Sequence, residues 1–178
     1  MAFVITIEDG DRNTLVDLYT THDAYLLPDG SEMFIRSEAA WCRSCACFTL
    51  VERLQQPEEM ESRAREYARD RLEHPTLTSK FYTKEKQTEL VMEGLTRALH
   101  QARQWQLALL NRESGPRCLE CEGAEFILLP DRNEWLSDPS IPYPRVRKRP
   151  QISHASMGYR GRLFDTEGRR IDGRYASH

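Results

Sequence analysis

The stretch AAWCRSCACF, residues 39 to 48, places three cysteines within six positions of a chain that has only five. The remaining two lie in SGPRCLECEG, residues 114 to 123. Clustered thiols of this kind serve as a redox pair, as a set of disulfides, or as a metal site whose two halves lie far apart in the sequence. The choice among these three decides how the chain is held together.

The cellular compartment bears on that choice. The N-terminal residues MAFVITIEDGDRNTLVDLY lack a basic lead followed by an apolar run, so no secretory signal is expected. No uncharged apolar stretch approaches the roughly 18 residues needed to span a bilayer. We therefore expect a soluble, cytoplasmic protein. Because that compartment is reducing, paired cysteines indicate metal ligands or catalytic thiols rather than disulfides.

Two CxxC elements, CRSC and CLEC, account for four of the five cysteines. A CxxC turn places two sulfurs on one side of a tight loop, and two such loops facing each other supply four thiolates about 2.3 Å from a Zn²⁺ ion. Four thiolates with no open position describe a closed, structural zinc site, one per chain. The predicted ligands are Cys42, Cys45, Cys118 and Cys121.

Two other uses of these thiols, as a redox pair or as unliganded core residues, fit the sequence less well than zinc binding. A redox pair needs a helix N-terminus to lower the pKa of its first thiol, but FTLVERL and GAEFILL, which follow the two pairs, read as strands. Unliganded core cysteines rank third, because two independent CxxC spacings beside strands are an improbable coincidence. The fifth thiol, Cys47, would either replace Cys45 as a ligand or be a small buried residue pointing away from the metal, and we expect the latter.

The segments WCRSCACFTL and RCLECEGAEFILL resemble the zinc-ribbon class of proteins. The resemblance implies two metal-binding knuckles at the tips of short β-hairpins, and it covers about a seventh of the chain. Ribbon knuckles commonly have glycine directly after the second cysteine, whereas this chain has Ala46 and Glu122, with Gly123 one position later. These departures leave open whether the backbone turns are the same. Ribbons occur in many unrelated proteins, so the resemblance implies no particular function.

The segment between the knuckles is predicted to be a helical hairpin over about residues 57 to 112. Pro57, followed by two glutamates, is typical of a helix start, and Pro75 ends the pattern. A second helix is expected from Lys84 to Arg112, ending before Ser114-Gly115-Pro116. Its apolar face recurs at spacings of three and four residues. Because an antiparallel pair returns the chain to where it left, the 72 residues between the clusters need not separate them in space.

Strands are expected on both sides of this insertion. The run FVITIE is rich in β-branched residues, and Pro28-Asp29-Gly30 predicts the turn of a hairpin with arms near 24–27 and 32–36. AEFILLP, residues 124 to 130, reads as a short buried strand. A second hairpin is expected to turn at Asp165-Thr166-Glu167-Gly168.

The predicted fold is therefore α+β: a zinc-ribbon-like β core split by an antiparallel helical hairpin, with a C-terminal basic extension and a β-hairpin. Residues 1–136 are expected to form a single zinc-stabilised domain. Four prolines between Asp138 and Gln151 predict an extended linker over 137–156. Residues 157–178 would then be a C-terminal hairpin tail.

Charge is distributed unevenly along the chain. The net charge is −3, but residues 144–178 contain nine Lys or Arg against three Asp or Glu, which leaves −9 for residues 1–143. Such an arm suits a polyanionic partner, a protein, or the acidic body of its own chain. The candidate contact residues are Arg145, Arg147, Lys148, Arg149, Arg160, Arg162, Arg169 and Arg170.

No catalytic constellation or nucleotide-binding motif is recognisable, and the five histidines are scattered. We therefore expect a non-catalytic, zinc-binding interaction module, an adaptor or accessory subunit that docks on a protein partner. The alternative is a nucleic-acid-binding accessory factor that uses the ribbon and the basic arm. A homo-oligomer is compatible with either function, and an enzyme, which would need an open metal position, ranks third.

Overall fold

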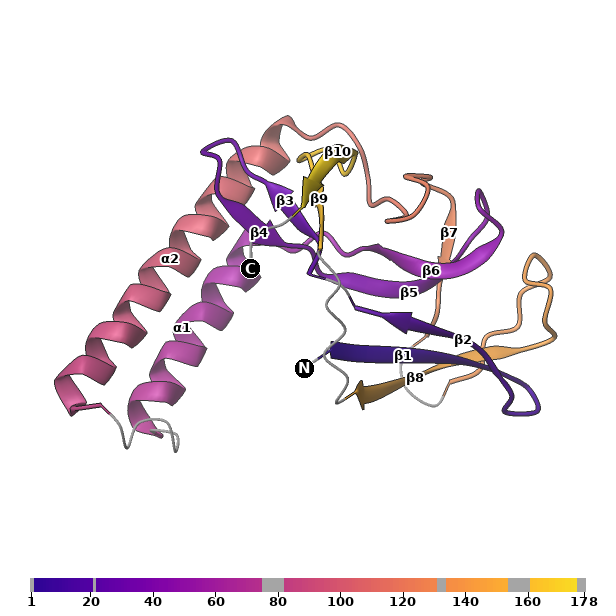
Figure 1. Ribbon diagram of the computed structural model, residues 1–178, viewed down its shortest axis with the longest axis horizontal. Helices are drawn as coiled ribbons and strands as arrows, with labels where there is room; N and C mark the ends of the chain where they lie inside the picture. Colours follow the sequence, from indigo (N-terminus) through magenta and orange to yellow (C-terminus); the bar gives the residue numbers. More distant parts are fainter. Residues whose placement is uncertain (1, 21, 75–81, 131–133, 154–160, 176–178) are drawn as a thin grey trace. The chain divides into compact units, whose positions relative to one another are not determined.

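The fold is that of a computed structural model. The structure describes the chain except residues 1, 21, 75–81, 131–133, 154–160 and 176–178. Over the described residues there are two helices and ten strands in three small sheets, which confirms the α+β class (Figure 1). The chain divides into two compact units: a β unit, residues 1–26, 32–54 and 113–178, and a hairpin unit, residues 27–31 and 55–112.

The first sheet of the β unit has the strand order β2-β1-β8. Its strands are β1 (Ala2–Asp9), β2 (Thr14–Tyr19) and β8 (Val146–Ser153), all antiparallel. The central strand β1 is rich in β-branched residues, and Val4, Thr6 and Ile7 are buried. At its end the Asp9 carboxylate accepts hydrogen bonds from the N–H groups of Asp11 and Asn13, which closes the turn into β2.

Strand β8 lies where we expected an extended linker over residues 137–156. It pairs with β1 along its whole length, and this places Arg147 directly opposite Glu8. The Arg147 guanidinium donates two hydrogen bonds to one oxygen of the Glu8 carboxylate, at 2.6 and 2.9 Å. The linker prediction was wrong for residues 146–153, because the basic segment is paired with a strand whose carboxylate matches its charge.

The second sheet has the order β10-β9-β3-β4. Its strands are β3 (Ala24–Leu26), β4 (Glu32–Phe34), β9 (Arg162–Phe164) and β10 (Arg170–Tyr175). The predicted hairpin of β3 and β4 is confirmed, and Gly30 in its turn has the positive φ of 79° that favours glycine. β9 pairs with β10 and runs parallel to β3, so the expected C-terminal hairpin belongs to a sheet.

The third sheet, with the order β6-β5-β7, leads to the cysteines. Its strands are β5 (Ser37–Cys42), β6 (Cys47–Glu52) and β7 (Phe126–Leu128). The turn between β5 and β6 contains the first CxxC element, and β7 follows the second. β7 confirms a short strand within residues 124–130, but it is a three-residue edge strand with Leu128 exposed, so the expected burial was wrong.

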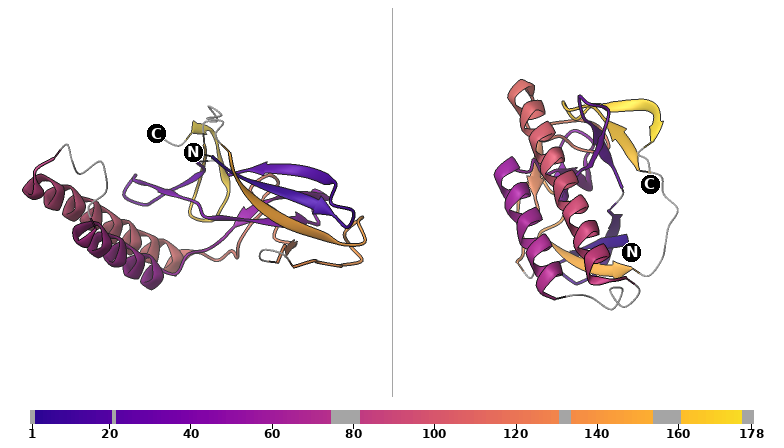
Figure 2. Two further views of the ribbon diagram at one scale, coloured as in Figure 1. Left: turned by 90° about the horizontal axis from the view of Figure 1, so that it is seen from below. Right: turned by 90° about the vertical axis from the view of Figure 1, so that its left-hand side faces the viewer.

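The hairpin unit contains α1 (Pro57–Glu73) and α2 (Lys84–Asn111), which lie side by side and run in opposite directions (Figure 2). α1 begins with Pro57 in its first turn, as predicted. α2 begins after Thr83, whose side chain accepts a hydrogen bond from the Lys86 N–H group. Trp105 is fully buried, and its indole N–H donates to the Gln55 carbonyl at 2.9 Å. Neither helix is long and apolar enough to cross a membrane.

Candidate metal centre

The first knuckle is the tip of the β5–β6 hairpin. β5 ends at Cys42 and β6 begins at Cys47, and these two residues face each other across the last pair of the ladder. The four residues between them form the turn. The N–H group of Arg43 donates to the carbonyl of Glu125 at 2.9 Å, which ties this turn to the segment after the second knuckle. The hairpin therefore holds Cys42 and Cys45 on a short, tethered loop.

The second knuckle is a turn without a hairpin of its own. Within it, the Cys118 N–H group donates to the Gly123 carbonyl and the Glu122 N–H group donates to the Cys118 carbonyl, both at 2.9 Å. The turn is held against β6 by a hydrogen bond from the Leu119 N–H group to the Leu50 carbonyl at 3.0 Å. β6 thus supports both knuckles, since it leaves the first and pairs with the second.

The backbone of both knuckles takes the left-handed conformation that favours glycine. Ala46 has φ of 51° and Glu122 has φ of 60°, and each comes directly after the second cysteine of its pair. Neither residue is a glycine, and a non-glycine residue in this region costs about 1–2 kcal/mol. Glu122 has a compensating contact, because its carboxylate accepts a hydrogen bond from the Arg170 N–H group at 2.8 Å.

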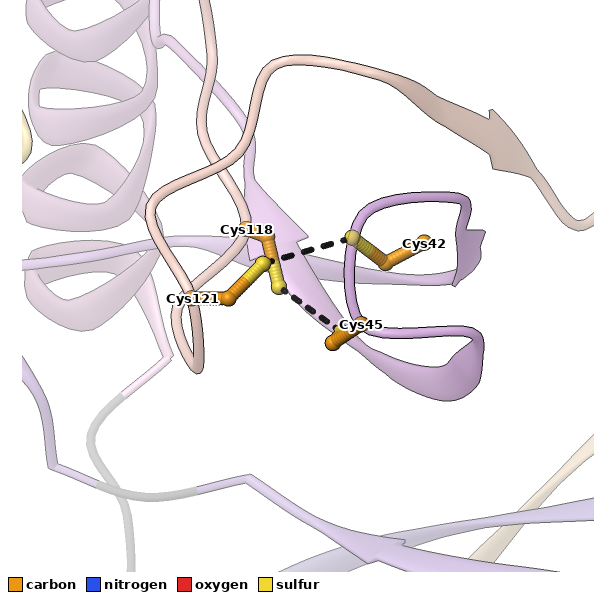
Figure 3. A group of neighbouring side chains, drawn as sticks. All are labelled: Cys42, Cys45, Cys118 and Cys121. Carbon is orange, nitrogen blue, oxygen red and sulfur yellow. Dashed lines mark hydrogen bonds between the residues drawn. The ribbon is translucent and has the colours of Figure 1, made fainter.

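The two knuckles bring four sulfurs together (Figure 3). The Sγ atoms of Cys42, Cys45, Cys118 and Cys121 all lie within 4.8 Å of one another. The Cys42–Cys121 pair is 3.5 Å apart and the Cys45–Cys118 pair 4.0 Å. Four sulfurs at 2.3 Å from a tetrahedral Zn²⁺ ion are separated by about 3.8 Å, a value that lies between these two. The four residues predicted as ligands are thus positioned to hold one metal ion.

The close approach of the knuckles explains why residue 123 is a glycine. A β-carbon at Gly123 would lie 2.5 Å from the Ser44 hydroxyl oxygen and 3.3 Å from Cys121 Sγ. The first distance is far shorter than side chains allow, so any other residue would push the two turns apart. Gly123 is therefore a packing requirement of the site, which is separate from the turn conformation at Glu122.

Burial and hydrogen bonding act on these thiols in opposite directions. Burial raises the pKa of the Cys42 thiol, but hydrogen bonds from the Cys45 backbone and the neighbouring thiols outweigh it and lower that pKa to about 7. At Cys118 burial prevails and raises the pKa, although the backbone of Cys121 and Glu120 also donates to its sulfur. The pKa of Cys45 is raised by burial and by the adjacent thiols. One thiolate forms readily, and several together need a cation to compensate their charge.

Cys47 is not the buried residue that we expected. Its side chain is exposed, and its Sγ lies 3.3 Å from the Sγ of Cys45. It stands beside the cluster without belonging to the four sulfurs that surround one point. The expectation of a buried position was wrong because Cys47, the first residue of β6, lies at the end of the sheet, where little packs over it.

A buried carboxylate that we did not single out from the sequence supports the second knuckle. Glu52, at the end of β6, is 2 % exposed. It accepts the Tyr25 hydroxyl at 2.7 Å and the Arg117 N–H group, directly before Cys118, at 2.8 Å. Thr49 lies under the same knuckle, with its hydroxyl oxygen 3.9 Å from Cys118 Sγ. An acidic residue closing the apolar run FTLVE is the only signal of this role in the sequence.

The basic residues of the C-terminal part are largely engaged within the chain. Arg147 and Arg149 both bind the Glu8 carboxylate. Arg162 forms ion pairs with Asp23 and with Glu120 of the second knuckle, each at 2.8 Å. The other candidate contacts are Arg169, paired with Asp165; Arg145, whose guanidinium lies 4.8 Å from the centre of the Trp135 ring; half-buried Lys148; exposed Arg170; and Arg160, which lies outside the described residues.

Comparison of the chain with models of protein families, with curated proteins and with solved structures gave no match. A function therefore has to be inferred from the chemistry of the cysteine cluster and of the exposed surfaces.

Proposed function

We propose that the protein is a zinc-stabilised, non-catalytic interaction module, an adaptor or accessory subunit that docks on a protein partner. The observation that carries the proposal is the set of four cysteine sulfurs within 4.8 Å of one another, with spacings that match a tetrahedral site. Four thiolates fill all positions of tetrahedral Zn²⁺ and leave none for a substrate. Such a closed site supports structure rather than catalysis.

The zinc ion would act as a cross-link in the β unit. Its ligands come in two pairs that are 73 residues apart from Cys45 to Cys118, with the whole helical insertion between them. A metal that binds only the folded arrangement contributes its binding free energy to folding. This contribution matters most in the third sheet, where β7 is only three residues long.

The hairpin unit is the proposed docking surface. Nine large apolar side chains of the described residues are exposed, and seven of them lie in this unit. They are Tyr67, Leu72, Tyr82, Leu90, Met92, Leu107 and Leu110. A concentration of exposed apolar groups in one unit favours a surface that another protein covers. The basic residues favour a protein partner over nucleic acid, since four of the eight candidates are already paired with carboxylates of the same chain.

Metal analysis of the purified protein tests the proposal. We expect one zinc ion per chain by elemental analysis and by native mass spectrometry. Cys42→Ser and Cys118→Ser should each lose the ion, because a site with three thiolates binds zinc much more weakly. Cys47→Ser is the matched control, a cysteine beside the cluster whose loss should leave the zinc content unchanged.

Two results would contradict the proposal. Zinc retained at one equivalent in the Cys118→Ser/Cys121→Ser double variant would exclude the four-cysteine site. Iron in place of zinc in protein isolated without added metal would keep the ligands but replace the ion, because four thiolates also suit iron.

A further inference from the structure

One face of α2 carries its charges in two separate blocks. This face, here called the outer stripe, contains positions 85, 89, 92, 96, 99 and 103, which recur at spacings of three and four residues. The face that packs against α1 is different, because Val91, Leu95 and Ala98 lie about 100° away around the helix axis. Met92, Thr96 and Arg103 on the stripe are exposed, whereas Leu99 is half-buried.

The charges on and beside the stripe change sign along the helix. Acidic residues predominate in the N-terminal half, where Lys86 is the exception, and basic residues occupy the C-terminal half, with Met92, Thr96 and Leu99 around the boundary. The acidic block is Glu85, Glu89 and Glu93, and the basic block is Arg97, Arg103 and His100, whose ring already contacts the Asp29 carboxylate at 2.7 Å. All six side chains are exposed. Six residues spanning the boundary, Glu89, Met92, Glu93, Thr96, Arg97 and His100, also line a shallow hollow of about 820 Å³.

This pattern is complementary to itself. Two copies of the stripe related by a two-fold axis run antiparallel, so the acidic block of each faces the basic block of the other. An axis through Thr96 would set Glu89 of one copy opposite Arg103 of the second copy. The apolar residues around the boundary then meet at the centre, and charged pairs flank them on both sides.

The packing of the hairpin unit leaves room for such a partner. From Lys84 to Gln101 no side chain of α2 is buried, and the buried ones are Ala102, Trp105 and Ala108 near its C-terminal end. A helix of 28 residues is about 42 Å long, and much of this length has only α1 to cover one side. Beyond the basic block, Leu107 and Leu110 are exposed, the latter at 77 %.

We propose that a second copy of this chain covers the outer stripe, forming an antiparallel homodimer through α2. The inference rests on the proposed role of the hairpin unit as the docking surface, but the metal has no part in it. The dimer is expected to be weak and salt-sensitive, because a single helix face gives a small interface and its flanking charges remain near solvent. Glu89 also has an intrahelical partner, Lys86, at 3.0 Å, with which the second copy must compete.

Charge exchange between the two blocks tests the proposal. The first variant is Glu89→Arg/Glu93→Arg, which makes the stripe basic, and the second is Arg97→Glu/Arg103→Glu, which makes it acidic. Analytical ultracentrifugation and light scattering over about 1 to 500 µM cover the affinities expected of a small interface. The wild-type protein should dimerise in this range, and in each variant the dissociation constant should rise about tenfold or more, because like charges now face each other.

Two combinations of these substitutions should restore dimerisation. A mixture of the two variants should form a heterodimer, since a predominantly basic stripe then faces a predominantly acidic one. One chain that carries all four substitutions should again form a homodimer. The control is Glu66→Arg/Glu73→Arg, an equal reversal at exposed positions of α1, which should dimerise as the wild type does.

Several outcomes would overturn the inference. A wild-type protein that stays monomeric over the whole range, with zinc bound, removes the dimer and leaves the proposed zinc module intact. Variants that dimerise as strongly as the wild type would place the interface elsewhere. Failure of the mixture and of the four-fold variant to recover the dimer would exclude charge pairing across the stripe. Wild-type protein that is isolated without zinc but still dimerises through the stripe would leave this inference intact and contradict only the proposed metal site. Helix content from circular dichroism identifies any variant that is unfolded. The folded variants and their mixtures then test the dimer.

Discussion

In the β unit, buried side chains come from every sheet, among them Ile7, Tyr25, Val51 and Phe164. In the hairpin unit, α1 buries only Pro57 and Ala68 among its residues, and α2 buries three side chains near one end. The β unit adds a cluster of four thiols and three buried carboxylates, Glu8, Asp23 and Glu52, each of which accepts hydrogen bonds. The hairpin unit instead has surface ion pairs such as Arg63 with Glu59, which contribute little in water.

The difference shows two ways of stabilising a unit whose core is small. In the β unit, a metal ion held by the four cysteines would cross-link the two knuckles and add its binding free energy to folding. A two-helix hairpin has a single seam, and further apolar burial has to come from outside. Stability measurements resolved by region can therefore separate the two units.

Removing the metal should produce the largest difference in stability between the two units. Chelation, or Cys118→Ser, should destabilise the β unit by about 4 kcal/mol or more, which lowers its melting temperature by about 10 °C. Hydrogen exchange followed by mass spectrometry should show rapid exchange in β5, β6 and the segment at residues 117–123. α1 and α2 should keep their protection. Equal loss of protection in both units would show that the metal stabilises the whole chain rather than the β unit.

Loss of the buried Glu52 carboxylate should have the second largest effect on stability. Glu52→Ala removes the acceptor of the Tyr25 hydroxyl and of the Arg117 N–H group, and leaves both donors without it in a buried place. Such a loss costs about 2–4 kcal/mol. We expect lower stability in chemical denaturation with zinc still bound at one equivalent. Glu38→Ala, which removes a partly exposed partner of Arg53 on β5, is the control and should change stability by less than about 1 kcal/mol.

Glu8 should make the first sheet sensitive to acid. The hydrogen bond from the Arg147 guanidinium is the largest influence on the pKa of Glu8, and together with Arg149 it lowers that pKa below its ordinary value of 4.5 although burial raises it. Because the pKa is lower in the folded chain, the contribution of Glu8 is fully present above about pH 4.5 and is lost as the pH falls through the folded value. Glu8→Gln should lower stability at pH 7 by about 1–3 kcal/mol and flatten its fall in this acidic range.

The sequence predicted best those features that depend on interactions between residues close together in the chain. Pro57, the glutamates after it and the Ser114-Gly115-Pro116 break act on their own neighbours, so the helix bounds were close to those observed. The same holds for the β3–β4 hairpin and for the two CxxC turns. The cluster of four cysteines, which could hold a metal ion, was also predictable, because two identical CxxC spacings in one chain indicate a shared purpose.

The parts that were not predicted depend on distant partners. The prolines and arginines of residues 144–150 favour an extended chain, and nothing near them reveals that β1 supplies the opposing carboxylate. Glu52 likewise looks like a surface residue until Tyr25 and Arg117 are seen around it. Strand register and buried polar networks require the whole fold, since each partner's environment is set by elements elsewhere in the chain.

Two reciprocal glycine substitutions should give the smallest and most selective effects. Ala46 has positive φ in the first knuckle, so Ala46→Gly should relieve strain and stabilise the β unit by about 0.5–1 kcal/mol. Gly94 lies inside α2 with no atom within 4 Å of where a β-carbon would be, so Gly94→Ala should stabilise the hairpin unit by a similar amount. Hydrogen exchange should assign each gain to its own unit.

Glu122→Gly provides a comparison for Ala46→Gly within the β unit. It relieves the same strain but loses the hydrogen bond to the Arg170 backbone, so its net effect on stability should be close to zero. A stabilisation by Glu122→Gly as large as that by Ala46→Gly would mean that the Glu122 carboxylate contributes nothing to holding the second knuckle.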